Sequence, residues 1–263
     1  MPTNQASAVT ISIVSHGQLA LVLPLLAQLD RYCTHCIEKV VLTSNVAEPD
    51  LLAGQLFGFP IERIANARPL GFGANHNQAF QRCRSAWFLV LNPDIRLDGD
   101  IIAPLMAQAH EDSGLLTPRI VEPNADGAME VPEPHRAMVT PLEILTRRRA
   151  GYASPASPEW IPGLFMLFRT RAFAQIEGFD ARRFFMYGED VDICARLQLA
   201  GWKIQVDADS MAVHEARRAS HRSMQHLYWH VSSLLKVWLS PTFWRYLRLQ
   251  RQLGRLRSPE DEA

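Results

Sequence analysis

Residues 87–94 read Trp-Phe-Leu-Val-Leu-Asn-Pro-Asp, and they are the strongest indication of fold class in the sequence. Its first five residues are all apolar, which is typical of a strand that other elements cover on both faces. Asn92 and Pro93 end the strand, and Asp94 follows at its carboxyl end. Ligands of open α/β sheets bind beyond these strand ends, so the sequence predicts that Asp94 binds a hard divalent cation, Mg²⁺ or Mn²⁺. The alternative is an Asn-Pro turn in which Asp94 caps the next turn.

Strand and helix patterns alternate on both sides of this stretch. Apolar and β-branched runs predict strands at residues 9–14, 39–43, 59–64, 115–121, 163–168, 203–206 and 211–213. Helical spacing predicts helices at 19–29, interrupted by Pro24, and at 75–84, 101–110, 171–176, 189–199, 221–239 and 243–256. We therefore expect an α/β fold with a mostly parallel sheet flanked by helices. Residues 1–215 would form this domain, and residues 216–263 a basic, amphipathic helical extension.

The composition is that of an ordinary globular protein. Of 263 residues, 48% are hydrophobic and 21% charged, which excludes a disordered chain or a disulfide-dense scaffold. Basic and acidic side chains are equal in number at 27 each, so we expect no nucleic-acid partner. No run approaches the ~18 apolar residues of a membrane span. No basic residue precedes Arg31, as a signal peptide would require, so we expect a cytoplasmic protein.

Two basic segments stand out from this balance. Residues 216–257 carry nine basic side chains and no acidic one, together with several tyrosines and tryptophans. We expect this extension to contact the inner face of the cytoplasmic membrane peripherally. The alternative is a helical pair packed on the domain with a solvated basic face. Residues 147–149 are three arginines within a proline-rich stretch at 122–160, and they form either a solvated tip or a mobile loop that meets an anionic substrate.

Cys33 and Cys36 have the CxxC spacing that marks a redox pair or half of a zinc site. The other cysteines are Cys83 and Cys194, so there is no second CxxC to complete four sulfur ligands. We therefore expect free, buried or half-buried thiols, which suit a reducing cytoplasm.

Three acidic residues, Glu189, Asp190 and Asp192, begin the helix predicted at 189–199. One interpretation is structural, because acids in a first turn stabilise the helix dipole and Asp192 can pair with Arg196 one turn later. The other interpretation is catalytic. An aromatic run at 184–187 precedes these acids, and a carboxylate that apolar neighbours partly remove from water can serve as a general base.

His214 follows the strand predicted at 211–213. A lone histidine is more often structural. If Asp94 lies nearby, however, a neutral imidazole, a carboxylate and phosphate oxygens together would make a divalent-cation site.

A glycine-rich segment, Gly71-Phe-Gly73-Ala-Asn75-His-Asn77, leads into the helix predicted at 75–84. Its two glycines would allow a ligand to approach the backbone closely. The segment is not a GxGxxG motif, which disfavours a dinucleotide site. The alternative is an ordinary helix N-terminus that Asn75 caps.

Taken in order, these motifs resemble family 2 of the glycosyltransferases, and within it the bacterial rhamnosyltransferase-like group. The resemblance covers residues 9–215. It rests on Gly71-Phe-Gly73 with Asn75 and Asn77, Asn92-Pro93-Asp94, Gly188-Glu189-Asp190-Val191-Asp192 through Arg196 to Gly201-Trp202, and His214. The resemblance implies the GT-A fold and an inverting, metal-dependent sugar transfer.

The resemblance also implies roles for single residues. Asp94 and His214 match metal ligands, Asp190 matches the general base, and Glu189 matches its neighbour in the acceptor pocket. The donor-binding positions would be Ser15, His16, Gly71, Gly73, Asn75, Asn77 and Asn92. Asn92 stands where the family has the first Asp of its DxD motif. Ser44 stands in a segment, 43–45, where the family often has an Asp that reads the base.

The implied activity is the transfer of a sugar, rhamnose first, from a nucleotide-diphosphate donor to a bacterial surface glycan or a lipid-linked glycan. A divalent cation, Mg²⁺ or Mn²⁺, is the implied cofactor. Three alternatives remain. The chain could be a transferase that uses another nucleotide sugar. It could be a catalytically silent binding module, since Asn92 replaces an acid. It could be a dehydrogenase on a doubly wound sheet, which the incomplete glycine pattern disfavours.

Overall fold

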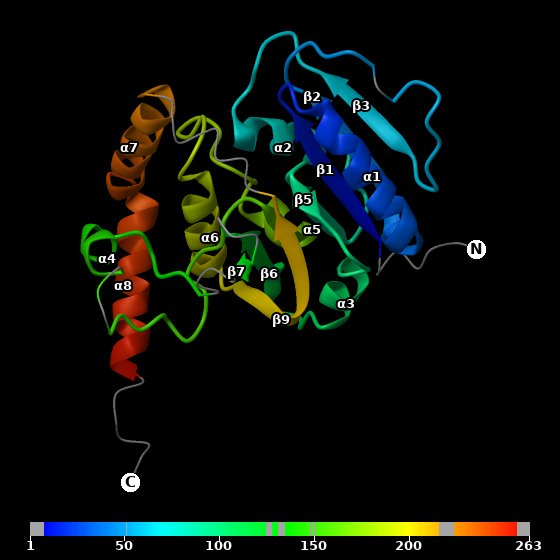
Figure 1. Cartoon of the computed structure of the whole chain (residues 1–263). Helices are drawn as coiled ribbons and strands as arrows, with labels where there is room; N and C mark the ends of the chain where they lie inside the picture. The colour runs from blue at the N-terminus through cyan, green and yellow to red at the C-terminus, as the bar shows by residue number, and fades with distance from the viewer. Residues whose placement is uncertain are drawn as a thin grey trace.

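The computed structural model describes residues 8–50, 52–124, 128–130, 135–147, 149, 151–215 and 224–256. Its centre is a sheet with helices on both faces (Figure 1). The strands are β1 (Val9–Ser15), β2 (Ile37–Ser44), β3 (Ile61–Ala65), β4 (Trp87–Leu91), β5 (Ile95–Arg96), β6 (Ser113–Pro123), β7 (Met129–Glu130), β8 (Phe165–Arg169) and β9 (Lys203–His214). The helices are α1 (Leu19–Cys33), the 3₁₀ turn η2 (Thr34–Cys36), α2 (Phe72–Phe80), α3 (Ile102–Ala107), α4 (Pro141–Thr146), α5 (Thr170–Gln175), α6 (Glu189–Leu199), α7 (Met224–Trp238) and α8 (Pro241–Leu256).

The strands lie in the order β3-β2-β1-β4-β8-β6-β9-β5, and β7 pairs with β6. The first four strands run parallel to one another, as the alternation of strands and helices predicts. β8 lies antiparallel between β4 and β6. β9 is parallel to β6, and the short β5 is antiparallel to β9. The α/β fold is therefore confirmed, and β8 makes its sheet mixed.

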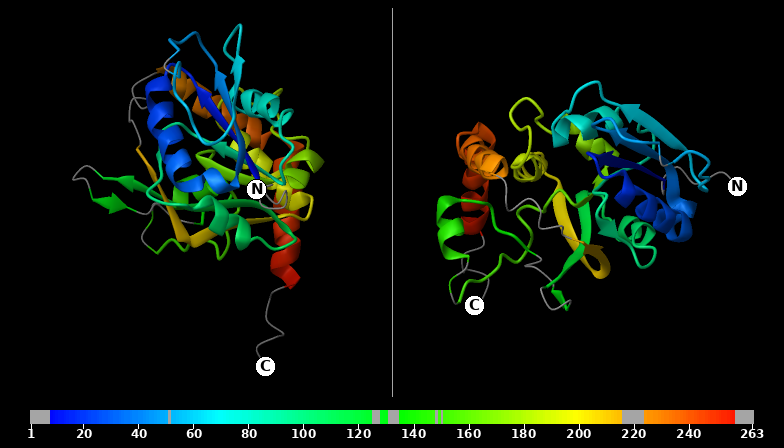
Figure 2. Two further views of the ribbon diagram at one scale, coloured as in Figure 1. Left: turned by 90° about the vertical axis from the view of Figure 1, so that its right-hand side faces the viewer. Right: turned by 45° about the horizontal axis from the view of Figure 1, so that its top comes forward.

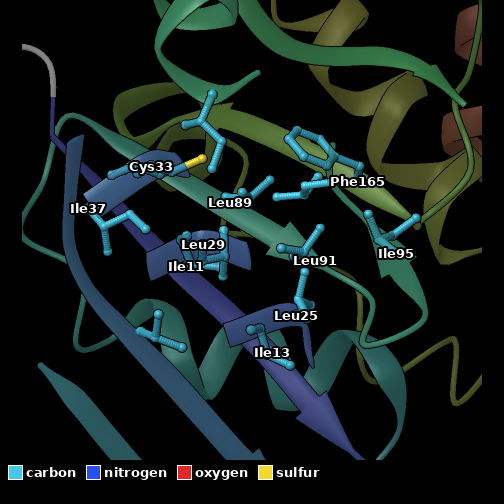
Figure 3. Packing of buried hydrophobic residues seen from close by; sticks show 14 of the residues in the cluster. Ile11, Ile13, Leu25, Leu29, Cys33, Ile37, Leu89, Leu91, Ile95 and Phe165 are labelled. Atoms are coloured by element: carbon cyan, nitrogen blue, oxygen red, sulfur yellow. The ribbon is translucent and has the colours of Figure 1, made fainter. Parts of the chain in front are cut away.

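Alternate side chains of the central strands enter two cores on opposite faces of the sheet, because successive residues of a strand point to opposite sides. On one face Ile11 and Leu89 belong to a cluster with Leu25 and Leu29 of α1 and with residues of α3 (Figure 3). On the other face Phe88 belongs to a cluster with residues of α2, α5, α6 and α8.

The two C-terminal helices are part of the second core. Val237 of α7 and Phe243 and Tyr246 of α8 are buried in the cluster that also contains residues of α6. Figures 1 and 2 show α7 and α8 beside α6, on the side of the molecule away from α1. A helical pair packed on the domain is thus present. The domain boundary expected at residue 216 stays a prediction, because residues 216–223 lie outside the described residues.

Three local expectations are wrong. Pro24 does not interrupt the first helix, because the buried apolar face of α1 holds the helix together around it. The strands expected at 203–206 and 211–213 are one strand, β9, whose register on β6 shifts between Pro118 and Arg119. Asn75 does not cap α2, since the helix begins at Phe72 with Gly71 as its N-cap.

Two further findings concern membrane-spanning helices and the cysteines. Within the described residues, every helix is too short or too polar to cross a membrane. All four cysteines are free and buried, as expected from their number and spacing.

Candidate active site

Asp94 and His214, the two metal ligands expected from the sequence, lie in contact. Asp94 follows β4, and His214 ends β9 directly opposite Ile95 of β5. Nε2 of His214 lies 3.3 Å from Oδ2 of Asp94. The main chain supports this contact, because the Glu215 N–H donates a hydrogen bond of 3.0 Å to the carbonyl of Asp94. The antiparallel pair β5–β9 thus joins two side chains that are 120 positions apart in the sequence.

Glu122 completes this cluster, although sequence reasoning missed it. It lies near the end of β6, and its Oε1 is 2.8 Å from Nδ1 of His214. A proton on Nδ1 directed at Glu122 leaves the lone pair of Nε2 facing Asp94. Burial alone lowers the pKa of His214, but hydrogen bonds and negative charge from Asp94 and Glu122 outweigh burial and raise the pKa. The strand-end rule that selects Asp94 could also have selected Glu122.

The unpaired oxygen of Asp94 tests whether this cluster suits a cation. Oδ1 of Asp94 is buried and has no hydrogen-bond partner, which is costly for a carboxylate oxygen. A carboxylate and an imidazole nitrogen are ligands that Mn²⁺ accepts, and the carboxylate also suits Mg²⁺. Asp94 and Nε2 of His214 therefore fit a divalent cation, and Glu122 fits the role of the outer carboxylate that orients the histidine.

Asp190 is connected to the end of the same strand, β4, through the main chain. It begins α6, and its carboxylate accepts hydrogen bonds from the N–H groups of Val191, at 2.9 Å, and of Gly163. Leu164, next to Gly163, accepts a hydrogen bond of 2.9 Å from the N–H of Asn92. The segment that enters β8 therefore connects the Asp190 carboxylate to the end of β4. Burial raises the pKa of Asp190, and the hydrogen bonds and the charge of Arg136 only partly oppose this shift.

Arg136 is a charged residue near both Asp190 and Glu122. Burial lowers the pKa of its guanidinium, while the negative charges of Asp190 and Glu122 act in the opposite direction. Its guanidinium carbon is 5.1 Å from the centre of the Trp160 ring, a cation–π contact. Sequence reasoning missed Arg136, which has no motif and reaches the site only through the fold of the proline-rich stretch.

The other two acids of α6 have different surroundings. Glu189 is buried, and its Oε2 has no hydrogen-bond partner. Burial, and then the charge of Asp190, raises the pKa of Glu189. Asp192 pairs with Nε of Arg196 at 2.7 Å, as the structural interpretation expects. Arg196 also donates to the carbonyls of residues 176 and 178, so this pair attaches α6 to the loop after α5.

A cavity of about 290 Å³ opens beside Asp190, between α4, α6 and α7. Its wall is mainly apolar, with Val139, Ile144, Trp160, Leu234 and Val237, and its polar lining includes Tyr187, His230 and Arg147. The Tyr187 ring stacks on His230 with 3.6 Å between ring centres. Tyr187 has φ of 68°, and Gly188 has φ of 83°. A tyrosine in this left-handed region is strained, and such strain concentrates at functional sites.

Residues 43–230, more than half of the chain, match the family model described as glycosyltransferase like family 2. The chain belongs to glycosyltransferase family 2. This assignment agrees with the resemblance drawn from the motifs, and it contradicts the dehydrogenase alternative.

Curated relatives of this family 2 protein include rhamnosyltransferases. It is 30% identical over 163 residues to N-acetylglucosaminyl-diphospho-decaprenol L-rhamnosyltransferase of Mycobacterium tuberculosis H37Rv, which covers 56% of this chain and 53% of that protein. It is 35% identical over 79 residues to rhamnosyltransferase WbbL of Escherichia coli K12, with 30% of each chain covered. The chain therefore spans about half the length of the mycobacterial relative that it matches.

Solved structures share the fold of this family 2 protein. GalNAc-T7 with UDP, GalNAc and Mn²⁺ matches with a TM-score of 0.61 and 17% identity, covering 80% of this chain and 44% of that one. Mannosyltransferase PcManGT from Pyrobaculum calidifontis with GDP-Man and Mn²⁺ also matches with a TM-score of 0.61, at 14% identity, covering 87% and 64%. These likenesses show the GT-A fold.

Ser15 and His16, which we expect to contact the nucleotide, differ in their exposure. His16 is exposed, with Nδ1 3.1 Å from the amide nitrogen of Asn45. Ser15 is buried and donates a hydrogen bond of 2.7 Å to Glu48, which also accepts one from the N–H of Leu19. The second oxygen of Glu48 is buried without a partner. The donor-binding role of Ser15 and His16 stays a prediction.

The glycine-rich segment is packed against protein. A Cβ on Gly71 would lie 2.3 Å from the carbonyl oxygen of Phe185, and one on Gly73 would lie 2.6 Å from Cβ of Phe179. The amide of Asn77 exchanges two hydrogen bonds with the main chain of Phe179, at 2.8 and 2.9 Å. Asn75 is buried and hydrogen-bonded to residues 66, 70 and 71. The glycines therefore let α2 approach the loop that precedes α6, and donor contacts from these four residues stay predictions.

Proposed function

We propose that this family 2 protein is an inverting, metal-dependent glycosyltransferase, with rhamnose as the first candidate sugar. One observation carries the proposal: two carboxylate groups with different surroundings share one end of the sheet. Asp94 lies against His214, and Asp190 is tied to the end of β4 through the main chain of residues 163–164. The first group suits a cation with a nucleotide diphosphate, and the second suits a general base.

Asp190 would act on the acceptor. An acceptor hydroxyl is a weak nucleophile until its proton is removed, and a carboxylate oxygen of Asp190 would take this proton. The hydroxyl oxygen would then form a bond to the anomeric carbon while the bond to the donor phosphate breaks on the opposite face. One such displacement inverts the anomeric centre without a covalent intermediate. Because burial raises the pKa of Asp190, this residue is a stronger base than an exposed aspartate.

Asp94 and His214 would hold the divalent cation, and Glu122 would keep His214 in the tautomer that leaves Nε2 available. When bound, the cation would neutralise negative charge that develops on the leaving diphosphate. Arg136 carries a positive charge beside both Glu122 and Asp190, which suits an anionic donor. Rhamnose is the first candidate because relatives from two bacteria are named rhamnosyltransferases.

The cavity beside Asp190 supports a lipid-linked glycan as acceptor. Its apolar wall and its single described arginine, Arg147, suit a ligand with a hydrocarbon part and an anionic part. The mycobacterial relative has a name that specifies a diphospho-decaprenol substrate. A bacterial surface glycan built on a lipid carrier is therefore the proposed acceptor class.

One face of α7 supports a peripheral membrane contact. Tyr228, Val231 and Leu235 of α7, with Leu239 directly after the helix, follow helical spacing and are 49–78% exposed. Lys236 on α7 is also exposed, as are several arginines of α8. Exposed apolar side chains next to cations suit an anionic lipid surface. Co-sedimentation with anionic liposomes at low salt tests this proposal, and Leu235→Glu should reduce the bound fraction whereas Met129→Glu, an exposed apolar position on β7, should not.

Turnover tests the proposed function. The protein with Mn²⁺ and a lipid-linked acceptor should release nucleoside diphosphate from dTDP-rhamnose faster than from a panel of other nucleotide sugars. Faster release from another donor would show that the protein transfers a different sugar by the same reaction. Binding of nucleotide sugars without release from any donor in the panel would instead support the silent binding module, which the replacement of an acid by Asn92 favours.

A further inference from the structure

A second group of metal-binding side chains lies at the end of the parallel strands remote from Asp94. Cys33, His35 and Cys36 occupy the end of α1 and the turn η2, directly before β2 begins. After Asp94 the chain runs back along α1, where the side chain of Gln28 accepts a hydrogen bond of 2.8 Å from the N–H of Leu97. This path brings Asp100, just before α3, to the turn that contains His35.

The ligand atoms of three of these residues are grouped. Nε2 of His35 lies 3.3 Å from Oδ2 of Asp100. One ligand atom each from His35, Cys36 and Asp100 lie within 4.8 Å of one another. Ligand atoms with bonds of about 2.0–2.3 Å to a tetrahedral Zn²⁺ lie about 1.6 times that far from one another, so separations of up to 4.8 Å must shorten by about 1 Å when the ion binds.

The carboxylate of Asp100 is already oriented. Its Oδ1 accepts hydrogen bonds from the N–H groups of Ile102, at 3.0 Å, and Ala103, at 3.2 Å, at the start of α3. Oδ2 is thereby directed toward His35. Ligating carboxylates in metal sites are commonly held by such outer hydrogen bonds.

Cys33 lies next to this group and is the candidate for a fourth ligand. Its side chain, at the end of α1, is buried in the core cluster that also contains residues of α3, and burial and then the negative charge of Asp100 raise the pKa of its thiol (Figure 3). Cys36 is also buried, and its sulfur lies 3.2 Å from the carbonyl oxygen of Cys33. His35 is the exposed member, with 61% of its side chain accessible, and it provides the route by which an ion enters.

We propose that Cys33, His35, Cys36 and Asp100 bind one Zn²⁺ in a structural site separate from the candidate active site. Two sulfurs, one imidazole nitrogen and one carboxylate oxygen form a donor set that Zn²⁺ takes tetrahedrally, whereas Mg²⁺ and Mn²⁺ prefer oxygen. Each thiol releases its proton to solvent when the ion binds, so binding weakens as pH falls. The ion joins the end of α1 to the loop before α3, two helices of the same core.

Cobalt binding to the full chain tests the proposal, with the thiols first reduced by a phosphine. One Co²⁺ per chain should produce visible bands of tetrahedral Co²⁺ and a near-ultraviolet thiolate-to-cobalt band, and Zn²⁺ should displace it. Zn²⁺ should also raise the thermal midpoint, and a chelator should reverse this increase. Cys36→Ser and Asp100→Asn should remove or shift the bands. His35→Gln alters an exposed side chain, so it keeps the test valid if the buried variants misfold, and it should weaken Co²⁺ binding at least about tenfold.

Matched controls separate this site from the others. His110→Gln changes another exposed histidine, and Asp94→Ala changes the candidate active site, so both should retain the thiolate-to-cobalt band. The proposal is overturned if no such band forms at stoichiometric Co²⁺. It is also overturned if the band survives in a Cys33→Ser, Cys36→Ser double variant. Neither outcome bears on sugar transfer, which is assayed with Mn²⁺ and nucleotide sugar.

Discussion

Two carboxylate groups at one end of the sheet contrast in their surroundings. Asp94 lies against an imidazole and keeps one buried oxygen without a partner. Asp190 lies beside a mainly apolar cavity and Glu189, and burial raises its pKa. The same residue type is thus prepared for a cation in one place and for a proton in the other. This difference teaches that environment, more than residue identity, separates a metal ligand from a general base.

We expect the largest effect on turnover from loss of the proposed general base, Asp190. Asp190→Asn removes the proton acceptor and leaves the Asp94 cluster unchanged, so kcat should fall about 10²–10⁴-fold. Affinity for the nucleoside diphosphate with Mn²⁺ should stay the same in calorimetry. Asp209→Asn, an exposed aspartate on β9, is the matched control and should retain full turnover. Undiminished kcat in Asp190→Asn would show that another group takes the proton.

Loss of the cation should be the next largest effect. Asp94→Ala removes a proposed ligand, and a chelator removes the ion, so either change should lower kcat/KM about 10²-fold. Nucleoside diphosphate binding should no longer depend on Mn²⁺ in the variant, as calorimetry with and without the ion would reveal. Asp98→Ala is the control, since this aspartate lies just after β5 and its side chain is 64% exposed. Equal Mn²⁺ dependence in Asp94→Ala and the parent would contradict the ligand role.

Glu122 should matter less, because it acts through His214. Glu122→Gln keeps a hydrogen-bond acceptor but removes the charge, so affinity for Mn²⁺ should fall about tenfold. Glu130→Gln on β7, also exposed, is the matched control. Direct Mn²⁺ titration measures both variants. If Glu122→Gln binds Mn²⁺ as the parent does, Glu122 does not orient the histidine.

We expect the smallest effect from a change at Arg136, which is near both Asp190 and Glu122. The basic form of Asp190 is populated above its pKa, so activity should fall as pH decreases through that value. The charge of Arg136 opposes the increase in this pKa, and Arg136→Gln should therefore move the acidic limb of the kcat profile to higher pH. Arg248→Gln, an exposed arginine on α8, should leave the limb in place. A shift to lower pH in Arg136→Gln would contradict the assignment.

Much of the parallel half of the fold could be predicted from local patterns. The apolar run of β4 and the acid-rich start of α6 match the structure from first to last residue, because each pattern reflects burial of its own element. The direction of β8 could not be predicted in this way. Its first four residues are apolar and buried on both faces, as the residues of β4 are, so nothing local distinguishes a parallel from an antiparallel neighbour.

Some residues of the candidate site could likewise be predicted from local patterns, and others could not. Asp94, Asp190 and His214 could be selected from their places at strand and helix ends. Arg136 could not, because its segment has no regular pattern. Glu122 stands at a strand end as Asp94 does, but only the fold shows that it faces His214. The packing contact of Gly71 could not be predicted either. Its lack of a side chain serves contact with Phe185, a partner that its own neighbours in sequence do not reveal.

The family, the alternation of strands and helices, and the residue types available for chemistry follow from the order and composition of the residues. Which of these residues come into contact follows from the folded arrangement alone. His214 reaches Asp94 because a two-residue strand pairs with the end of β9, and Asp100 reaches His35 because the chain turns back along α1. Such side-chain contacts depend on long-range packing, which brings together residues that no local pattern connects.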